Sequence, residues 1–189
     1  LGSQLQSRLA SEGITPDDYE NFFPFLETLS GTTVSIDPAS ACTAIFQSLN
    51  NRCQLVEATS VPALLKAVKN ETEQEGFRQA MRKDGAALVE FLFWLKNSVG
   101  KIPVTEYTAG RKLAELRAKQ PGFAGESFAP LVGYRDHGAM VHLSVEADNA
   151  NPLEPEGLLL FDSGGQYNTG TTDVTRTVAL GPLTDRQKT

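Results

Sequence analysis

Residues 158–177 read LLLFDSGGQYNTGTTDVTRT and place two Asp residues close together among strand-like and glycine-rich patterns. Four apolar residues predict a short buried strand that delivers Asp162 at its end. Two glycines follow and permit a sharp turn or a close backbone approach. A second strand pattern begins directly after Asp173. Two antiparallel strands joined in this way present both carboxylates at one place, which suits divalent cations. Asp beside Gly is also common in turns, so spacing alone leaves a purely structural role open.

Composition excludes several classes of protein. The chain has 189 residues, with 17 Lys and Arg against 23 Asp and Glu, a net charge of −6 and 40% apolar residues. The acidic balance argues against nucleic-acid binding, because no basic field is available to displace phosphate counterions. No apolar run approaches the roughly 20 residues that span a bilayer. Two cysteines, Cys42 and Cys53, argue against a disulfide framework or a structural zinc site and favour a reducing compartment.

The character of the sequence changes near residue 60. Residues 1–59 mix short helix and strand patterns and predict part of an α/β domain, with a helix that starts at Thr15. From residue 60 the pattern is first helical and then, after Pro121, strand-like. The helices are expected at Ser40–Leu49 and Asn70–Asn97 and from Thr105 to just before Gln120, and the strands at 33–37, 53–56, 127–134, 139–145, 157–162 and 174–180.

Both ends of the chain suggest a piece of a longer protein. Leu1 is not a natural initiator residue. Near the other end, Thr184 and Gln187 form a helix capping box, but the apolar run that such a box precedes is absent. We therefore interpret the chain as a fragment.

The stretch from Asp162 to Thr177 resembles the metal-binding hairpin of the aminopeptidase P (Xaa-Pro aminopeptidase) family, which belongs to the pita-bread metallopeptidases. That family has two Asp eleven residues apart, the second followed by Ile/Val-Thr-Arg-Thr; here 173 − 162 = 11, and Val-Thr-Arg-Thr follows. Residues 68–73 and 82–88 are similar to its entry helices, and residues 127–130 and 138–142 to the strands that carry its active-site His. The resemblance covers residues 60–189 well and residues 1–59 more loosely.

The resemblance implies an α+β fold. Residues 60–189 are expected to be the N-terminal half of a pita-bread (creatinase/aminopeptidase) domain, with helices packed on one side of a curved antiparallel sheet. Residues 1–59 are expected to be the C-terminal part of a creatinase-N-like α/β middle domain. A missing second half, related by pseudo-symmetry, would complete the sheet, so these residues alone would leave a sheet edge and an apolar face uncovered.

The resemblance also implies a site. Asp162 and Asp173 are expected to be two of five ligands of a dinuclear centre, with Asp173 bridging both ions; Mn²⁺ is expected, with Zn²⁺ and Co²⁺ as alternatives. His142 is expected outside the ligand set, where it positions the scissile peptide or stabilises the tetrahedral intermediate. His137 is interpreted as a surface-loop residue. The family's remaining ligands, one His and two Glu, lie downstream of the hairpin, so the 189 residues alone are expected to be inactive.

The function that the resemblance implies is hydrolysis of the bond between an N-terminal residue and a following proline, by a cytoplasmic homodimer that contacts neither nucleic acid nor membrane. A prolidase that cuts Xaa-Pro dipeptides and a non-catalytic pita-bread domain that binds peptides are the alternatives. A further alternative is an aspartic protease, because Leu160 to Gly164 fits its apolar-apolar-Asp-Ser-Gly signature. The helical content of the chain argues against that reading, because retroviral-type subunits are almost all β.

Overall fold

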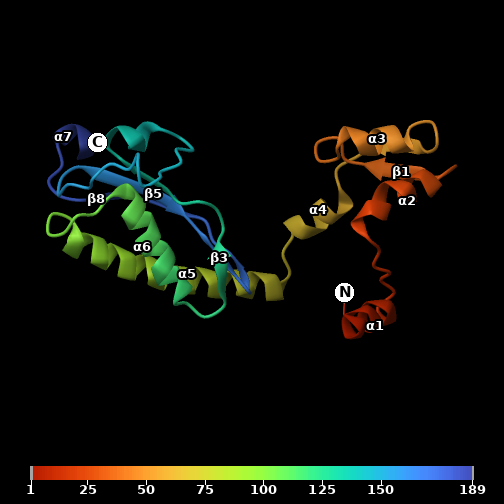
Figure 1. The fold of residues 1–189 in the computed structure, drawn as a ribbon, viewed down its shortest axis with the longest axis horizontal. Helices are drawn as coiled ribbons and strands as arrows, with labels where there is room; N and C mark the ends of the chain where they lie inside the picture. Colours follow the sequence, from red (N-terminus) through yellow and green to blue (C-terminus); the bar gives the residue numbers. More distant parts are fainter. Residues whose placement is uncertain (1, 189) are drawn as a thin grey trace. The chain divides into compact units, whose positions relative to one another are not determined.

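The computed structural model describes residues 2–188, which divide into two compact units between Val68 and Lys69 (Figure 1). This spatial division comes later than the boundary predicted after residue 59, and the identity of the two domains stays a prediction. Among the described residues, no helix combines the length and the apolar composition that crossing a bilayer requires.

The first unit contains a small parallel β-sheet with short helices. Strands β1 and β2 pair in parallel from Thr33 opposite Gln54 to Ile36 opposite Glu57. Leu26, Ile36 and Leu49 are its buried apolar side chains. The elements are α1 (Ser3–Ser11), η1 (Tyr19–Asn21), α2 (Phe22–Thr28), β1 (Thr33–Ile36), α3 (Thr43–Leu49), β2 (Gln54–Glu57) and α4 (Val61–Ala67).

The helix expected to start at Thr15 begins later, so that prediction was wrong. Residue Asp18 is extended, and a 3₁₀ turn follows it at Tyr19. The Asp17 carboxylate accepts hydrogen bonds from the backbone N–H of Asp18 and from the Asn21 side chain, at 2.8 and 2.7 Å. Asp side chains commonly make such local bonds, which compete with helix formation.

Two capped helices open the second unit. α5 (Glu71–Ser98) begins with a capping box, in which the Glu73 N–H donates to Asn70 and the Asn70 N–H donates to Glu73. α6 (Glu106–Ala118) begins with a corresponding box between Thr105 and Thr108. Such boxes satisfy backbone donors that have no partner inside the helix. Both helices agree with the predicted ones.

Antiparallel strands form the rest of the second unit. The sheet orders are β3-β6-β7 and β4-β5-β8, so β5 is the central strand of its sheet. Asp162 on β5 stands opposite Leu131 on one side and Thr175 on the other. The α+β class and the antiparallel pairing are therefore confirmed. The elements are β3 (Phe123–Glu126), β4 (Leu131–Tyr134), η2 (Arg135–Ala139), β5 (Leu158–Ser163), β6 (Gly165–Tyr167), β7 (Gly170–Thr171), β8 (Val174–Ala179) and α7 (Asp185–Lys188).

The strand predicted over 139–145 does not form. η2 follows β4 directly, and the residues after it are irregular, with His142 in the left-handed region at φ 61°. A Cβ atom on Gly133 would lie 2.9 Å from the Cα of Gly138, so η2 packs against the face of β4. The segment therefore covers the sheet instead of extending it, which alternation of residue types cannot reveal.

The core of the second unit lies between α5, α6 and the sheet. Burial alternates along β5, with Leu159, Phe161 and Ser163 fully buried. The rings of Phe91 and Phe161 meet edge to face at 5.2 Å between centroids. Because strand side chains alternate between faces, Asp162 projects from the face opposite the helices.

A buried ion pair joins the two helices to the strands. Asp84 on α5 and Arg117 on α6 are both 0% exposed, with Nε to Oδ1 at 2.7 Å and Nη2 to Oδ2 at 3.1 Å. The Tyr167 hydroxyl donates to Asp84 at 3.0 Å, and Arg117 Nη2 donates to the Ser163 carbonyl at 3.4 Å. Burial, followed by the Asp84 charge, raises the pKa of Tyr167. The phenol therefore keeps its proton and donates at neutral pH, and this contribution to stability fades only when the pH rises above the ordinary value of 10.0.

We expect Arg117→Met to lower the free energy of unfolding by about 3–5 kcal/mol, because it leaves the Asp84 carboxylate buried without a partner. Arg82→Met is the matched control, since it removes an exposed ion pair with Glu75 at 3.4 Å. Such pairs contribute about 0–1 kcal/mol. Urea denaturation of both variants measures the difference, and equal losses would contradict this role for the buried pair.

Candidate metal centre

Asp162 has the strongest structural sign of a missing ligand. It is the second-last residue of β5, and its Oδ1 atom is buried without a hydrogen-bond partner. An ionised carboxylate can only accept, and buried oxygens of this kind are rarely left unpaired. A cation is a partner that fits this oxygen, because carboxylates are preferred ligands of hard divalent ions.

The second candidate ligand, Asp173, lies one residue before β8. Ser163 pairs with Val174, and Asp162 pairs with Thr175. Side chains two residues apart on an extended segment share a face, so Asp173 is on the same side as Thr175 and Asp162. Asp173 is exposed. The hairpin thus brings the two carboxylates to one end of neighbouring strands, as the sequence predicted.

Close backbone contacts hold this hairpin in shape. Thr172 exchanges hydrogen bonds with Gly165, each 2.9 Å long, through its backbone N–H and its hydroxyl. The Ser127 hydroxyl donates to the Thr172 carbonyl at 2.9 Å. A Cβ atom on Gly164 would collide with the Thr172 carbonyl oxygen and the Ser127 hydroxyl. Only glycine allows the chain to pass here, two residues after Asp162.

The structure places His142 and Asp162 around one cavity of about 190 Å³. His137 and Thr175 also line it, whereas Asp173 does not. His142 is exposed, in the segment between η2 and β5. The side chain of His142 has no hydrogen-bond partner within residues 2–188, which leaves its ring nitrogens available. The cavity therefore combines a carboxylate with an unpaired oxygen and a histidine.

The donor set of these residues covers only part of a metal's coordination shell. Across residues 2–188, no group of three or more His, Cys, Asp or Glu side chains is placed to hold an ion. Asp162 and Asp173 are therefore the two candidate ligands that the hairpin supplies, without a third side chain from the described residues. They fit a divalent cation that takes further ligands from elsewhere.

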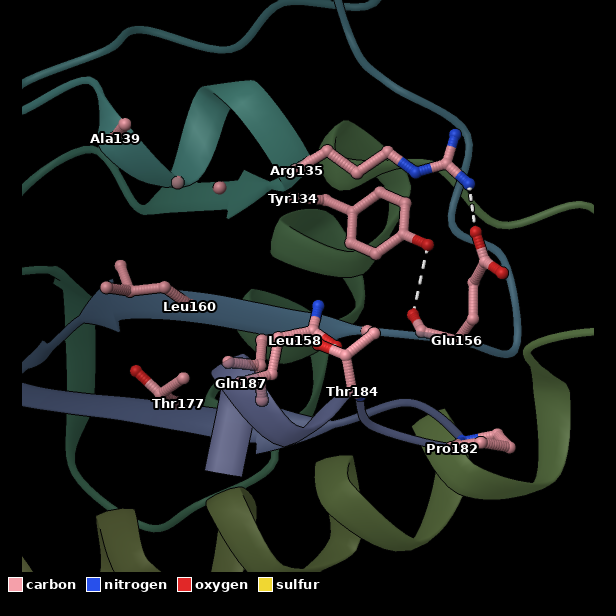
Figure 2. A pocket seen from close by; sticks show the side chains of 13 residues that line it. Tyr134, Arg135, Ala139, Glu156, Leu158, Leu160, Thr177, Pro182, Thr184 and Gln187 are labelled. Carbon is pink, nitrogen blue, oxygen red and sulfur yellow. Dashed lines mark hydrogen bonds and ion pairs between the residues drawn. The ribbon is translucent and has the colours of Figure 1, made fainter. Parts of the chain in front are cut away.

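A second, larger cavity of about 510 Å³ lies near the end of the described chain (Figure 2). Tyr134 and Glu156 form one wall, where the Tyr134 hydroxyl donates to the Glu156 carbonyl at 3.0 Å. Thr184 and Gln187 lie at the opposite side in Figure 2. Its lining contains neither Asp162 nor Asp173 nor His142, so it is separate from the candidate metal centre.

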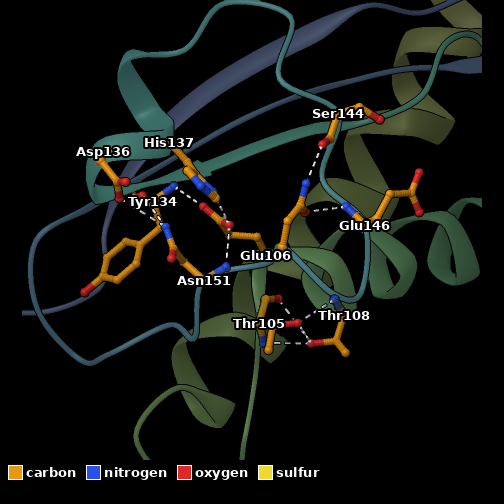
Figure 3. A network of polar contacts seen from close by, with 10 residues as sticks. Thr105, Glu106, Thr108, Tyr134, Asp136, His137, Ser144, Glu146 and Asn151 are labelled. Carbon is orange, nitrogen blue, oxygen red and sulfur yellow. Dashed lines mark hydrogen bonds and ion pairs between the residues drawn. The ribbon is translucent and has the colours of Figure 1, made fainter.

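Sequence reasoning missed the buried Glu106 and misplaced His137 at the surface. Glu106 is 0% exposed, and its Oε1 accepts from the Tyr134 N–H at 2.6 Å (Figure 3). Its Oε2 accepts from the Asn151 N–H at 2.7 Å and lies 2.8 Å from His137 Nδ1. The His137 side chain is only 15% exposed. A Glu in the first turn of a helix is usually solvated, so the sequence held no signal of this burial.

The sequence matches the models of two protein families. The model of metallopeptidase family M24 matches residues 75–189, and that of the creatinase/prolidase N-terminal domain matches residues 1–73. The match to the first covers more than half of the chain. The chain therefore belongs to metallopeptidase family M24.

Curated relatives and solved structures agree with this assignment. A probable Xaa-Pro aminopeptidase P from Botryotinia fuckeliana is 34% identical over the whole chain and 30% of its own length. Aminopeptidase P1 from Lotus japonicus is 36% identical over 84% of the chain and 27% of its own length. The chain thus spans about a third of the length of the curated relatives it matches.

An X-prolyl aminopeptidase structure from Caenorhabditis elegans, described as a cytosolic enzyme with a di-nuclear active site, superposes with a TM-score of 0.87. It is 27% identical and covers 98% of this chain and 32% of its own. A prolidase from Thermococcus sibiricus gives a TM-score of 0.71 at 20% identity over 98% of this chain and 52% of its own, which shows the fold alone. The predicted pita-bread relationship is confirmed, and the aspartic-protease alternative is wrong: Asp162-Ser163-Gly164 belongs to an M24 hairpin.

We expect Gly164→Ala to destabilise the protein by about 1–3 kcal/mol, because the added methyl group forces the hairpin strands apart. Mn²⁺ affinity is expected to fall as well, since the displaced backbone carries Asp162. Gly85→Ala is the matched control: nothing lies within 4 Å of its Cβ position, in the helix α5. That change is expected to stabilise by about 0.5–1 kcal/mol. Urea denaturation and calorimetric Mn²⁺ titration test both, and an unchanged Gly164→Ala variant would refute this reading of the hairpin.

Proposed function

We propose that this chain is part of a two-metal aminopeptidase that releases an N-terminal residue preceding proline. The observation that carries the proposal is the buried, unpartnered Oδ1 of Asp162, a residue that lines one cavity together with His142. The names of the curated relatives and the family membership of the chain support it.

Asp162 and Asp173 are the residues that hold the cations in this proposal. Asp173 would contact both ions, and Asp162 would bind one of them. The strand register brings both residues to the same end of the hairpin, and two-metal hydrolase sites hold their ions about 3.5–4 Å apart. When bound, such a pair of ions supplies Lewis-acid activation of the attacking water and of the scissile carbonyl. Manganese is the proposed metal, because hard carboxylate ligands suit it.

His142 acts on the substrate from outside the ligand set. Its ring has no competing partner within residues 2–188 and borders the same cavity as Asp162. From there an imidazole N–H donates a hydrogen bond to the carbonyl oxygen, where negative charge develops during attack. Donors fixed in advance at that position lower the barrier more than solvent can.

The setting proposed for the enzyme follows its relatives. The Caenorhabditis elegans protein is described as cytosolic, and we propose a cytoplasmic location for this protein as well. We also propose that it is a homodimer. Peptides with proline at the second position are the proposed substrates. Because the described residues supply only Asp162 and Asp173 to the centre, residues 1–189 by themselves are expected to be inactive. The prolidase and non-catalytic alternatives have less support, since the curated relatives described above bear aminopeptidase names.

Hydrolysis of Ala-Pro-Ala by the full-length gene product tests the proposal. Asp162→Asn and Asp173→Asn are each expected to lower kcat/KM by on the order of 10³-fold, because losing a ligand removes several kcal/mol of transition-state stabilisation. Chelation is expected to abolish turnover, and Mn²⁺ to restore it. Ala-Ala-Ala should be cleaved far more slowly.

Asp148→Asn is the control for these variants, since Asp148 is an exposed residue in a turn away from the cavity. Its kcat/KM should equal that of the unaltered protein. Turnover that survives chelation, or full activity of Asp162→Asn, would refute the proposed mechanism.

A further inference from the structure

The segment that carries His142 needs an external restraint. Between η2 and β5, residues 140–157 lie outside every strand, so no sheet ladder fixes His142. Its φ of 61° is a backbone conformation that residues other than Gly rarely adopt. Such a backbone persists only where its surroundings determine it. The source of that restraint decides how well the ring is positioned at the cavity.

Three side-chain contacts attach residues 135–139 to the rest of the fold. Arg135 pairs with Glu156 at 2.6 Å, and Asp136 accepts from Asn151 at 3.2 Å, but both contacts are exposed. The third joins His137 Nδ1 to Glu106 Oε2 at 2.8 Å, where the two side chains are 15% and 0% exposed. Buried hydrogen bonds to a charged group are stronger than exposed ones and less weakened by solvent.

The geometry fixes the direction of this bond. A carboxylate oxygen accepts only, so Nδ1 must carry the proton and donate it. Glu106 begins α6, and its carboxylate also accepts from the backbone N–H groups of Tyr134 and Asn151. The anchor is therefore the first residue of a core helix, and its carboxylate also binds the last residue of β4 and Asn151, in the second half of the 140–157 segment (Figure 3).

His137 also lines the cavity that contains the candidate site. His137, His142 and Asp162 all line it. The His137 carbonyl accepts from the Met140 N–H at 3.1 Å, the bond that ends η2 two residues before His142. Because only residues 138–141 separate the two histidines, we expect a displacement of His137 to move His142 as well.

We propose that His137 is a positioning residue: its hydrogen bond to the buried Glu106 holds the 135–143 segment so that His142 faces the substrate beside Asp162. The turnover part of the test rests on the proposed function, whereas the spectroscopic part does not. His137 does not act on the substrate in this proposal, and its effect passes through His142.

Turnover of Ala-Pro-Ala by the full-length gene product gives the first test. His137→Leu is expected to lower kcat by about 10- to 100-fold with little change in KM, the size of effect that a small misplacement of a reacting group produces. His137→Asn should restore most of the rate, because its amide N–H lies where Nδ1 does. Glu156→Gln, which weakens only the exposed pair with Arg135, should leave kcat unchanged.

A double-mutant cycle separates positioning from general damage. In a His142→Ala background, His137→Leu is expected to have almost no further effect on kcat, because the group that it positions is gone. Additive losses, or failure of His137→Asn to restore the rate, would overturn the proposal.

Histidine NMR on the full-length gene product, with ¹⁵N-labelled rings, tests positioning without any substrate. The His142 ring signals should shift or broaden in His137→Leu and remain in place in His137→Asn and Glu156→Gln. Unchanged His142 signals in His137→Leu would overturn the positioning role even if the enzyme proposal holds. Shifted signals with no Xaa-Pro turnover by the unaltered protein would instead contradict the proposed function alone.

Discussion

The ion pair between Asp84 and Arg117 is the interaction on which the rest of the second unit depends. Removing two charges from water is costly, and here two-pronged contact between the side chains offsets that cost together with hydrogen bonds from Tyr167 and to Ser163. Ser163 directly follows Asp162, and Tyr167 lies in the hairpin. The same contacts that join α5 to α6 therefore also fix the strand end that carries the candidate ligand.

Around this constraint, the two faces of β5 have different roles. Leu159 and Phe161 pack against the helices and supply the apolar core. Asp162 is turned the other way, into the cavity that η2 and the following residues cover. Because Gly164 has no side chain, its backbone lies close to the Thr172 carbonyl, and Asp173 follows, one residue before the strand that pairs with β5. A packed core on one face thus supports the cavity and the candidate ligands on the other.

Local signals predicted much of this fold, and long-range contacts explain the rest. Apolar residues at helical spacing after Asn70 and Thr105 predicted both long helices, and the structure shows a capping box at the start of each. The Asp162–Asp173 hairpin was found because its residues are contiguous. The covering segment at 139–145 has a strand-like pattern, yet its path is set by the close approach of Gly133 to Gly138. The contact of His137 with Glu106 spans 31 residues, and no local pattern encodes it.

The proposed function requires that Asp162 and Asp173 bind metal, and a crystal structure of the full-length gene product grown with Mn²⁺ tests this requirement. Anomalous difference density locates the ions without reference to turnover. We expect two peaks about 3.5–4 Å apart, with Asp173 between them and Asp162 beside one of them. Peaks that lie away from both carboxylates, or hairpin carboxylates that bind no ion under these conditions, would contradict it.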